Sequence, residues 1–196
     1  MRHSPYPVIL DACVLYPARL RDLLMHLGIA GLYQPKWSRF IHDEWCRNLL
    51  INRPDIAPEA LRRTVDLMNA ALPDANVTGF AGLINGLVLP DPDDRHVLAA
   101  AIRAKAEIIV TLNHKDFPAE SLLPFGIETL HPDVFISDLF DLNHALALEA
   151  VRRQRQSLKH PPMTVDEFLE MLLKQGLPMT VKELGKVRIS GEILLG

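Results

Sequence analysis

Short apolar runs along the chain alternate with longer stretches in which apolar residues recur at helical spacing. The runs at 7–10, 107–111 and 126–130 predict buried strands. The stretches over 18–30, 38–50 and 58–72, and those that begin at Asp94 and Asp133, predict helices. This alternation indicates an α/β fold around a mostly parallel central sheet. Ligands of such sheets bind beyond the carboxyl ends of the strands, where Asp11 and Thr111 fall.

From residue 144 onward the pattern is helical only. We therefore predict a first domain over 1–143 and a small all-helical C-terminal extension over 144–196. Two stretches, Thr164–Glu167 and Thr180–Glu183, have the pattern of a capping box and predict two helix starts. His160-Pro161-Pro162 is the candidate hinge. We expect residues 144–158 to pack on the body and those beyond His160 to protrude toward an antitoxin, a second subunit in a homodimer, or RNA.

Composition indicates a soluble globular protein, with 48% hydrophobic and 23% charged residues among 196. No apolar run approaches the roughly 20 residues that span a membrane, and the N-terminal residues lack the apolar core of a signal peptide. Two cysteines give no disulfide framework. We expect a cytoplasmic protein with no membrane partner. The net charge of −3 combines an acidic body with a more basic end, which argues against a generic nucleic-acid binder.

The segment Asp91–Asp94 places three carboxylates at the start of an Ala-rich helix. Asp91 suits the N-cap, and Asp91 and Asp93 could simply favour the positive end of the helix dipole. Asp94 differs, because its spacing puts it on the apolar face with Val97 and Leu98. A carboxylate that points toward a core must be paired or must bind a cation.

Other acids fall at the ends of predicted buried elements. Asp11 follows the first strand, and Asp116 follows the strand that ends at Thr111. Glu44 lies in a helix beside the apolar Phe40, Ile41 and Trp45. Taken singly, Asp11 could start a turn and Glu44 could lie on a solvated face. Together they predict a carboxylate cluster, which repels itself unless cations fill it. Oxygen ligands favour Mg²⁺ or Mn²⁺, and such an ion would activate water for phosphodiester hydrolysis.

The motifs Leu10–Leu15, Glu44, Asp94–Ala101 and Thr111–Phe117 resemble those of PIN-domain ribonucleases, and of the longer VapC-type toxins that carry a C-terminal helical extension. The resemblance covers roughly residues 6–142 and implies a PIN-like three-layer fold. It also implies a metal-dependent endoribonuclease that is the toxin of a type II toxin–antitoxin pair, with RNA as substrate and an antitoxin as partner. Asp11, Glu44 and Asp94 would be the central acids around Mg²⁺ or Mn²⁺.

Two positions depart from that family's pattern. Cys13 stands where the family often has Asn, Ser or Thr, and a thiol is a weak donor to the neighbouring acid. Asn113 stands at an acid position, so the fourth carboxylate is either absent or supplied by Asp116. We retain Asp116 as a catalytic candidate and Asn113 as a metal-ligand candidate, with Asn113 expected nearer the site. The alternative function is an inactive PIN-fold module that binds RNA or protein.

The functional roles of the basic residues and histidines are less clearly indicated by the sequence. Arg19, Arg21, Arg152 and Arg153 are the candidates for RNA phosphate contacts, although solvated helix charges are the simpler interpretation. His96 and His114 are interpreted as surface histidines, with phosphate contact as the alternative. A haloacid-dehalogenase-type phosphatase would need a second Asp where this chain has Cys13.

Overall fold

The computed structural model describes residues 5–159 and 162–189. These residues form two compact units. The sheet unit runs to Tyr16 and then from Tyr33 to His131. The helical unit comprises Pro17–Leu32 and the chain from Pro132 onward. The helix α2 (Ala18–Ile29) thus belongs with the C-terminal helices, while the domain boundary at 143/144 stays a prediction.

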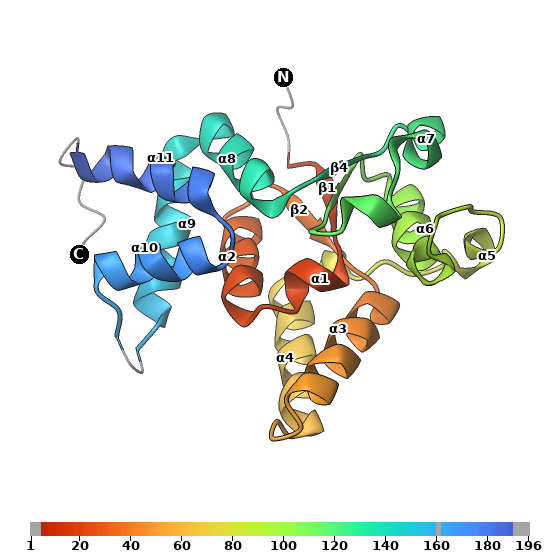
Figure 1. The fold of residues 1–196 in the computed structure, drawn as a ribbon, viewed down its shortest axis with the longest axis horizontal. Helices are drawn as coiled ribbons and strands as arrows, with labels where there is room; N and C mark the ends of the chain where they lie inside the picture. Colours follow the sequence, from red (N-terminus) through yellow and green to blue (C-terminus); the bar gives the residue numbers. More distant parts are fainter. Residues whose placement is uncertain (1–4, 160–161, 190–196) are drawn as a thin grey trace. The chain divides into compact units, whose positions relative to one another are not determined.

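A four-stranded parallel sheet lies at the centre of the sheet unit, in the order β2-β1-β3-β4 (Figure 1). The strands are β1 (Pro7–Leu10), β2 (Gln34–Lys36), β3 (Ile108–Val110) and β4 (Glu128–Leu130). Three of them and the α/β fold class were predicted. The pattern did not predict β2, because Gln-Pro-Lys has no apolar run; its proline is tolerated since β2 lies at the sheet edge.

Parallel pairing brings the ends of β1 and β3 side by side. Val8 pairs with Ile108 and Leu10 with Val110, and the backbone N–H of Asp11 donates to the Val110 carbonyl at 3.1 Å. All three β3 side chains are buried, as are Val8–Leu10. Each such aliphatic side chain stabilises the fold by about 1.5–3 kcal/mol. The first residues after the two strands, Asp11 and Thr111, are thereby fixed beside each other.

Helices pack against the sheet. Helix α6 packs against β1 and β3, and its Val97, Leu98 and Ala99–Ala101 are fully buried. Ser38 caps α3, as predicted, by accepting a hydrogen bond from the Ile41 N–H at 3.3 Å. The helices of this unit are α1 (Ala12–Leu15), α3 (Arg39–Asn52), α4 (Pro58–Ala71), α5 (Ala81–Ile84), α6 (Arg95–Ala104) and α7 (Ala119–Leu122).

Short 3-10 turns connect these elements: η1 (Pro73–Ala75), η2 (Pro92–Asp94), η3 (His114–Asp116) and η4 (Leu123–Phe125). Asp91 is the predicted N-cap and accepts from the Asp93 N–H at 2.8 Å. The turn it caps is η2, however, and α6 begins only at Arg95. Asp94 is therefore the residue directly before α6, and Val97, Leu98 and Ala99–Ala101 are still the buried residues of α6.

The helical unit consists of α2 (Ala18–Ile29), α8 (Pro132–Leu142), α9 (His144–Ser157), α10 (Val165–Lys174) and α11 (Pro178–Ile189). Helix α9 packs on α2, and α11 packs on α8. The expectation that everything beyond His160 protrudes is therefore wrong for α11. His160 and Pro161 of the candidate hinge lie outside the described residues. None of the described helices has the length and hydrophobicity needed to cross a membrane.

The two predicted capping boxes have different outcomes. Thr164 and Glu167 form one, with the Thr164 N–H donating to Glu167 Oε2 at 2.8 Å. The second is wrong, because α11 begins at Pro178 and Thr180 lies inside its first turn, fully buried. The N–H groups of Met179 and Thr180 donate instead to the buried carboxylate of Asp133, at 2.7 and 2.8 Å. A residue 46 positions away thus caps this helix.

Candidate active site

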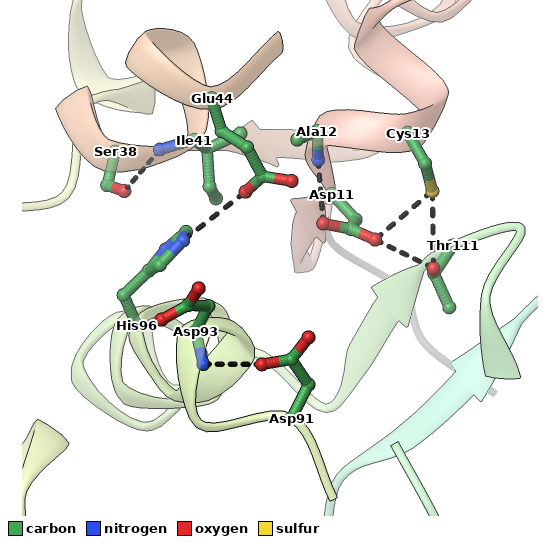
Figure 2. Close-up of polar contacts among 10 residues, drawn as sticks. All are labelled: Asp11, Ala12, Cys13, Ser38, Ile41, Glu44, Asp91, Asp93, His96 and Thr111. Carbon is green, nitrogen blue, oxygen red and sulfur yellow. Dashed lines mark hydrogen bonds and ion pairs between the residues drawn. The ribbon is translucent and has the colours of Figure 1, made fainter. Parts of the chain in front are cut away.

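Asp11 is held at the end of β1 by several donors. Its Oδ1 accepts from the Ala12 N–H at 2.7 Å, and its Oδ2 accepts from Thr111 Oγ1 at 2.7 Å and from Cys13 Sγ at 3.1 Å (Figure 2). Only 5% of the residue is exposed. Burial raises the pKa of Asp11 above its usual value, although the hydrogen bonds from Thr111 and Cys13 oppose that rise. The Asp11 carboxylate is thus fixed in position while its charge is poorly solvated.

From the sequence, Cys13 was expected to be only a weak hydrogen-bond donor to Asp11. Its sulfur accepts from the Leu112 N–H at 3.2 Å and contacts Thr111 Oγ1 at 3.3 Å, besides donating to Asp11. Burial, followed by the charge of Asp11, raises the pKa of Cys13 to about 12. Cys13 therefore stays a neutral thiol and keeps the proton that it donates.

Glu44 approaches Asp11 from α3, and His96 approaches Glu44 from α6. His96 Nε2 lies 3.4 Å from Glu44 Oε2, with 13% and 29% of the two side chains exposed. The His96 ring stacks on Phe40, with 5.7 Å between ring centroids. The interpretation of His96 as a surface histidine is therefore wrong. Its partner could not be found from sequence spacing, because the contact depends on how α3 and α6 pack.

The pKa of Asp94 is raised by its burial and by the charges of the surrounding acids. Burial raises its pKa most, and the charges of Asp11, Asp116, Glu44 and Asp91 add to the rise, in that order, to about 7. We call these five residues the acidic cluster. Figure 2 shows the carboxylates of Asp11, Glu44 and Asp91 directed toward the same space, although they come from separate segments of the chain. The charges of Asp11 and Glu44 both raise the pKa of Asp94, so the three central acids that the sequence singled out lie near one another.

Asn113 and Asp116 lie on the same side of η3. The Asn113 side-chain amide donates a hydrogen bond to Asp116 Oδ2, and the Asn113 N–H donates to Thr111 Oγ1 at 2.9 Å. Asn113 is exposed, whereas Asp116 is half-buried and acts on Asp94 through its charge. Which of the two completes the site stays a prediction.

The comparisons with known proteins match both parts of this architecture. The sequence model of the PIN domain matches residues 7–115, more than half of the chain. The chain belongs to the PIN-domain family. The model of the VapC50 C-terminal domain matches residues 132–186. The predicted resemblance to PIN-domain proteins with a VapC-type C-terminal extension is thereby confirmed. Asp11, Glu44 and Asp94 lie inside the matched PIN range, and Asp116 lies just beyond it.

One relative has a printed function. A protein named "Putative ribonuclease VapC50", from Mycobacterium tuberculosis (strain ATCC 25618 / H37Rv), is 37% identical over 110 residues. The match covers 55% of this chain and 65% of that protein, which is slightly less than two thirds of its length. No solved structure matches the chain.

The acidic cluster of this PIN domain has the chemistry of a site for a hard divalent cation. Its donors are all carboxylate oxygens, and their mutual repulsion helps to raise the pKa of Asp94. A cation between them would remove that repulsion. Within the part of the chain that the structure describes, no three His, Cys, Asp or Glu side chains are placed to hold one ion as they stand. Ligation would therefore require side-chain adjustments among Asp11, Glu44 and Asp94.

The predicted RNA-contacting arginines lie in the helical unit. Arg19 and Arg21 are on α2, and Arg152 and Arg153 are on α9. The two segments meet where the Gln154 side-chain amide donates to the Arg19 carbonyl at 2.9 Å. Arg153 also pairs with Glu149, with 3.0 Å between Nε and Oε1. Two basic segments that lie far apart in the sequence are thus side by side on the packed helices α2 and α9.

Proposed function

We propose that this chain is a metal-dependent endoribonuclease that hydrolyses RNA phosphodiester bonds. The single observation that carries the proposal is the acidic cluster, in which the charge of Glu44 raises the pKa of Asp11 and the charges of both raise the pKa of Asp94. In a PIN domain, such a cluster at the carboxyl edge of a parallel sheet supports binding of Mg²⁺ or Mn²⁺. The printed name of the relative supports RNA as the substrate.

Each residue of the acidic cluster would have its own role in hydrolysis. Asp11 and Asp94 would ligate the cation directly, and Glu44 would ligate it or orient the attacking water. A bound Mg²⁺ or Mn²⁺ supplies a Lewis acid that activates water and neutralises charge on the phosphate. Thr111 and Cys13 would keep the Asp11 carboxylate in place through the hydrogen bonds at its Oδ2. Asn113 or Asp116 would complete the ligand set.

The basic part of the α2–α9 pair would hold the RNA backbone. Arg19, Arg21, Arg152 and Arg153 supply guanidinium groups, which bind phosphate oxygens well. Replacing both Arg152 and Arg153 by alanine should raise KM for RNA and weaken its dependence on salt, with kcat unchanged. A change in kcat alone would contradict this assignment.

We further propose that the protein is the toxin of a type II toxin–antitoxin pair that acts in the cytoplasm. The support is the match of residues 132–186, which lie in the helical unit, to the VapC50 C-terminal domain. Expression of the chain alone should then arrest growth, and co-expression of a protein from a neighbouring reading frame should relieve the arrest. Growth that is unaffected by an active enzyme would contradict the toxin role but not the nuclease.

The second candidate is an inactive PIN module that only binds RNA or protein, and it is favoured by Cys13 and by Asn113 in place of an acid. The two functions separate in one experiment with the purified full chain, single-stranded RNA and Mn²⁺. Asp11→Asn should reduce cleavage by about 100-fold or more while the fold persists, because the cluster loses a charged ligand. Glu120→Gln, at an exposed acid on α7, is the matched control and should cleave normally. Equal cleavage by wild type and Asp11→Asn would reject the proposed site, and RNA binding without cleavage by the wild type would support the inactive module.

A further inference from the structure

His96 contacts both the acidic cluster and the apolar packing beside it. Its Nε2 is 3.4 Å from Glu44 Oε2, and its ring stacks on Phe40 at a 29° interplanar angle. Phe40 in turn packs edge-on against Phe80, with 5.8 Å between centroids. Because α6 is anchored on β1 and β3, the imidazole is held from its backbone and from its ring face. Glu44, in contrast, reaches the site through a flexible side chain.

The two ring nitrogens of His96 have different surroundings. Nδ1 is buried and has no hydrogen-bonding partner among the described residues, whereas Nε2 faces the Glu44 carboxylate. A buried N–H without an acceptor costs more than a buried lone pair without a donor. The neutral ring is therefore favoured in the form that has its proton on Nε2, which directs an N–H at Glu44.

The Glu44 carboxylate oxygen that does not face His96 is available to the acidic cluster. Figure 2 shows the Glu44 carboxylate with one oxygen toward His96 and the other toward Asp11. A glutamate side chain has several rotamers, and fixing it before a ligand arrives reduces the entropy cost of using it.

We propose that His96 is a positioning residue that holds one oxygen of Glu44 and thereby directs the other toward Asp11. The proposal rests on the proposed function, in which Glu44 ligates the cation or orients water. The His96 N–H would fix the orientation of the Glu44 carboxylate by hydrogen bonding to it, as outer neighbours of metal ligands do. It also implies that Glu44 serves the site with a single oxygen.

Two substitutions distinguish a positioning role of His96 from a packing role, because one keeps the apolar contact of the ring and the other keeps its hydrogen-bond donor. His96→Leu keeps an apolar contact with Phe40 but removes the donor, and His96→Gln keeps a donor near the Nε2 position but removes the ring. Positioning predicts that His96→Leu lowers kcat by about 10–100-fold with KM for RNA unchanged, while His96→Gln stays within about 3-fold of wild type. A packing role predicts the reverse order, which would overturn the proposal.

Binding of Mn²⁺, measured by calorimetry without RNA, gives a readout that does not depend on turnover. His96→Leu should weaken Mn²⁺ affinity by about 10-fold and His96→Gln should not. If the wild type binds Mn²⁺ with this pattern yet cleaves no RNA, the proposed function fails and the role of His96 stands. If the wild type cleaves RNA and His96→Leu equals it in both kcat and Mn²⁺ affinity, the role of His96 fails and the nuclease stands.

Nitrogen NMR of the metal-free wild type tests the proposal without any variant. The His96 ring should give one signal set with the proton on Nε2, and Glu44→Ala should convert it to a mixture of tautomers. A wild-type ring with its proton on Nδ1, or one that exchanges between tautomers, would overturn the proposal even if His96→Leu fails to fold.

Discussion

Thr111 Oγ1 donates a 2.7 Å hydrogen bond to Asp11 Oδ2, although the two residues are 100 positions apart in the sequence. Both are the first residues after neighbouring parallel strands, and both are buried. The same Thr111 oxygen accepts from the Asn113 N–H at 2.9 Å. One side chain thus connects the first acid of the cluster to the loop that carries the last candidate ligands.

Replacement of Thr111 by valine should destabilise the protein by about 1–3 kcal/mol, because the buried Asp11 carboxylate and the Asn113 N–H both lose a hydrogen-bonding partner. Urea unfolding measures this change. Mn²⁺ affinity should fall together with stability, since the Asp11 carboxylate is less firmly placed. Thr111→Ser keeps the hydroxyl and is the matched control. Equal Mn²⁺ affinity in the valine and serine variants would show that Thr111 supports the fold but not the site.

Cys13 should be unreactive toward alkylating reagents. With a pKa of about 12, its thiolate fraction is about one in ten thousand near pH 8. Iodoacetamide labelling in a Cys46→Ser background, followed by mass spectrometry, tests this. Cys13→Ser should retain activity because a hydroxyl can also donate to Asp11, and Cys13→Ala should lose part of it. Rapid labelling of the folded protein at Cys13 would contradict the buried, proton-donating thiol.

The stability of the metal-free protein should depend on the protonation of Asp94. Its pKa of about 7 lies above the usual aspartate value of about 3.9, so between these values the folded state holds a proton that the unfolded state has lost. The contribution of Asp94 is therefore greatest at low pH and declines as pH rises through this window. Thermal melts in EDTA from about pH 4 to about pH 8 should show that decline relative to Asp94→Asn, which lacks the titrating group.

Saturating Mn²⁺ should reverse this trend, because the ion binds the ionised carboxylates and stabilises the folded state more as pH rises. A wild-type curve that runs parallel to that of Asp94→Asn without metal would contradict the raised pKa. A parallel curve with Mn²⁺ present would contradict Asp94 as a ligand.

Asp133 should control whether the end of the helical unit is folded. Its carboxylate is 3% exposed and accepts from the Met179 and Thr180 N–H groups and from Thr180 Oγ1. Asp133→Ala should cost about 2 kcal/mol and raise amide hydrogen exchange over 178–186. Asp138→Ala, also on α8, is the comparison variant. Because Asp133 lies in the unit without the acidic cluster, Mn²⁺ affinity should not change; unaltered exchange in α11 would contradict its capping role.

Sequence periodicity predicted the parts of the fold that follow from local pattern. Strands at 7–10 and 108–110 are buried apolar runs, and the side chains directly after parallel strands must meet at one sheet edge, so the Asp11 position followed. The second capping box failed because its pattern is local while the true cap of α11, Asp133, comes from another helix. His96 was misjudged for the same reason, since its contact with Glu44 depends on how two helices pack.

The fourth position of the site should be decided by removing each candidate in turn. Asp116 is half-buried and its charge raises the pKa of Asp94, whereas Asn113 is exposed and donates to Asp116. If Asp116 is the ligand, Asp116→Ala should weaken Mn²⁺ binding by about 10-fold and lower the pKa of Asp94, because one repelling charge is gone. Asn113→Ala should then have a small effect, since it removes only a neighbour of the ligand. The opposite order of Mn²⁺ affinities would make Asn113 the ligand and Asp116 the residue that orients its amide.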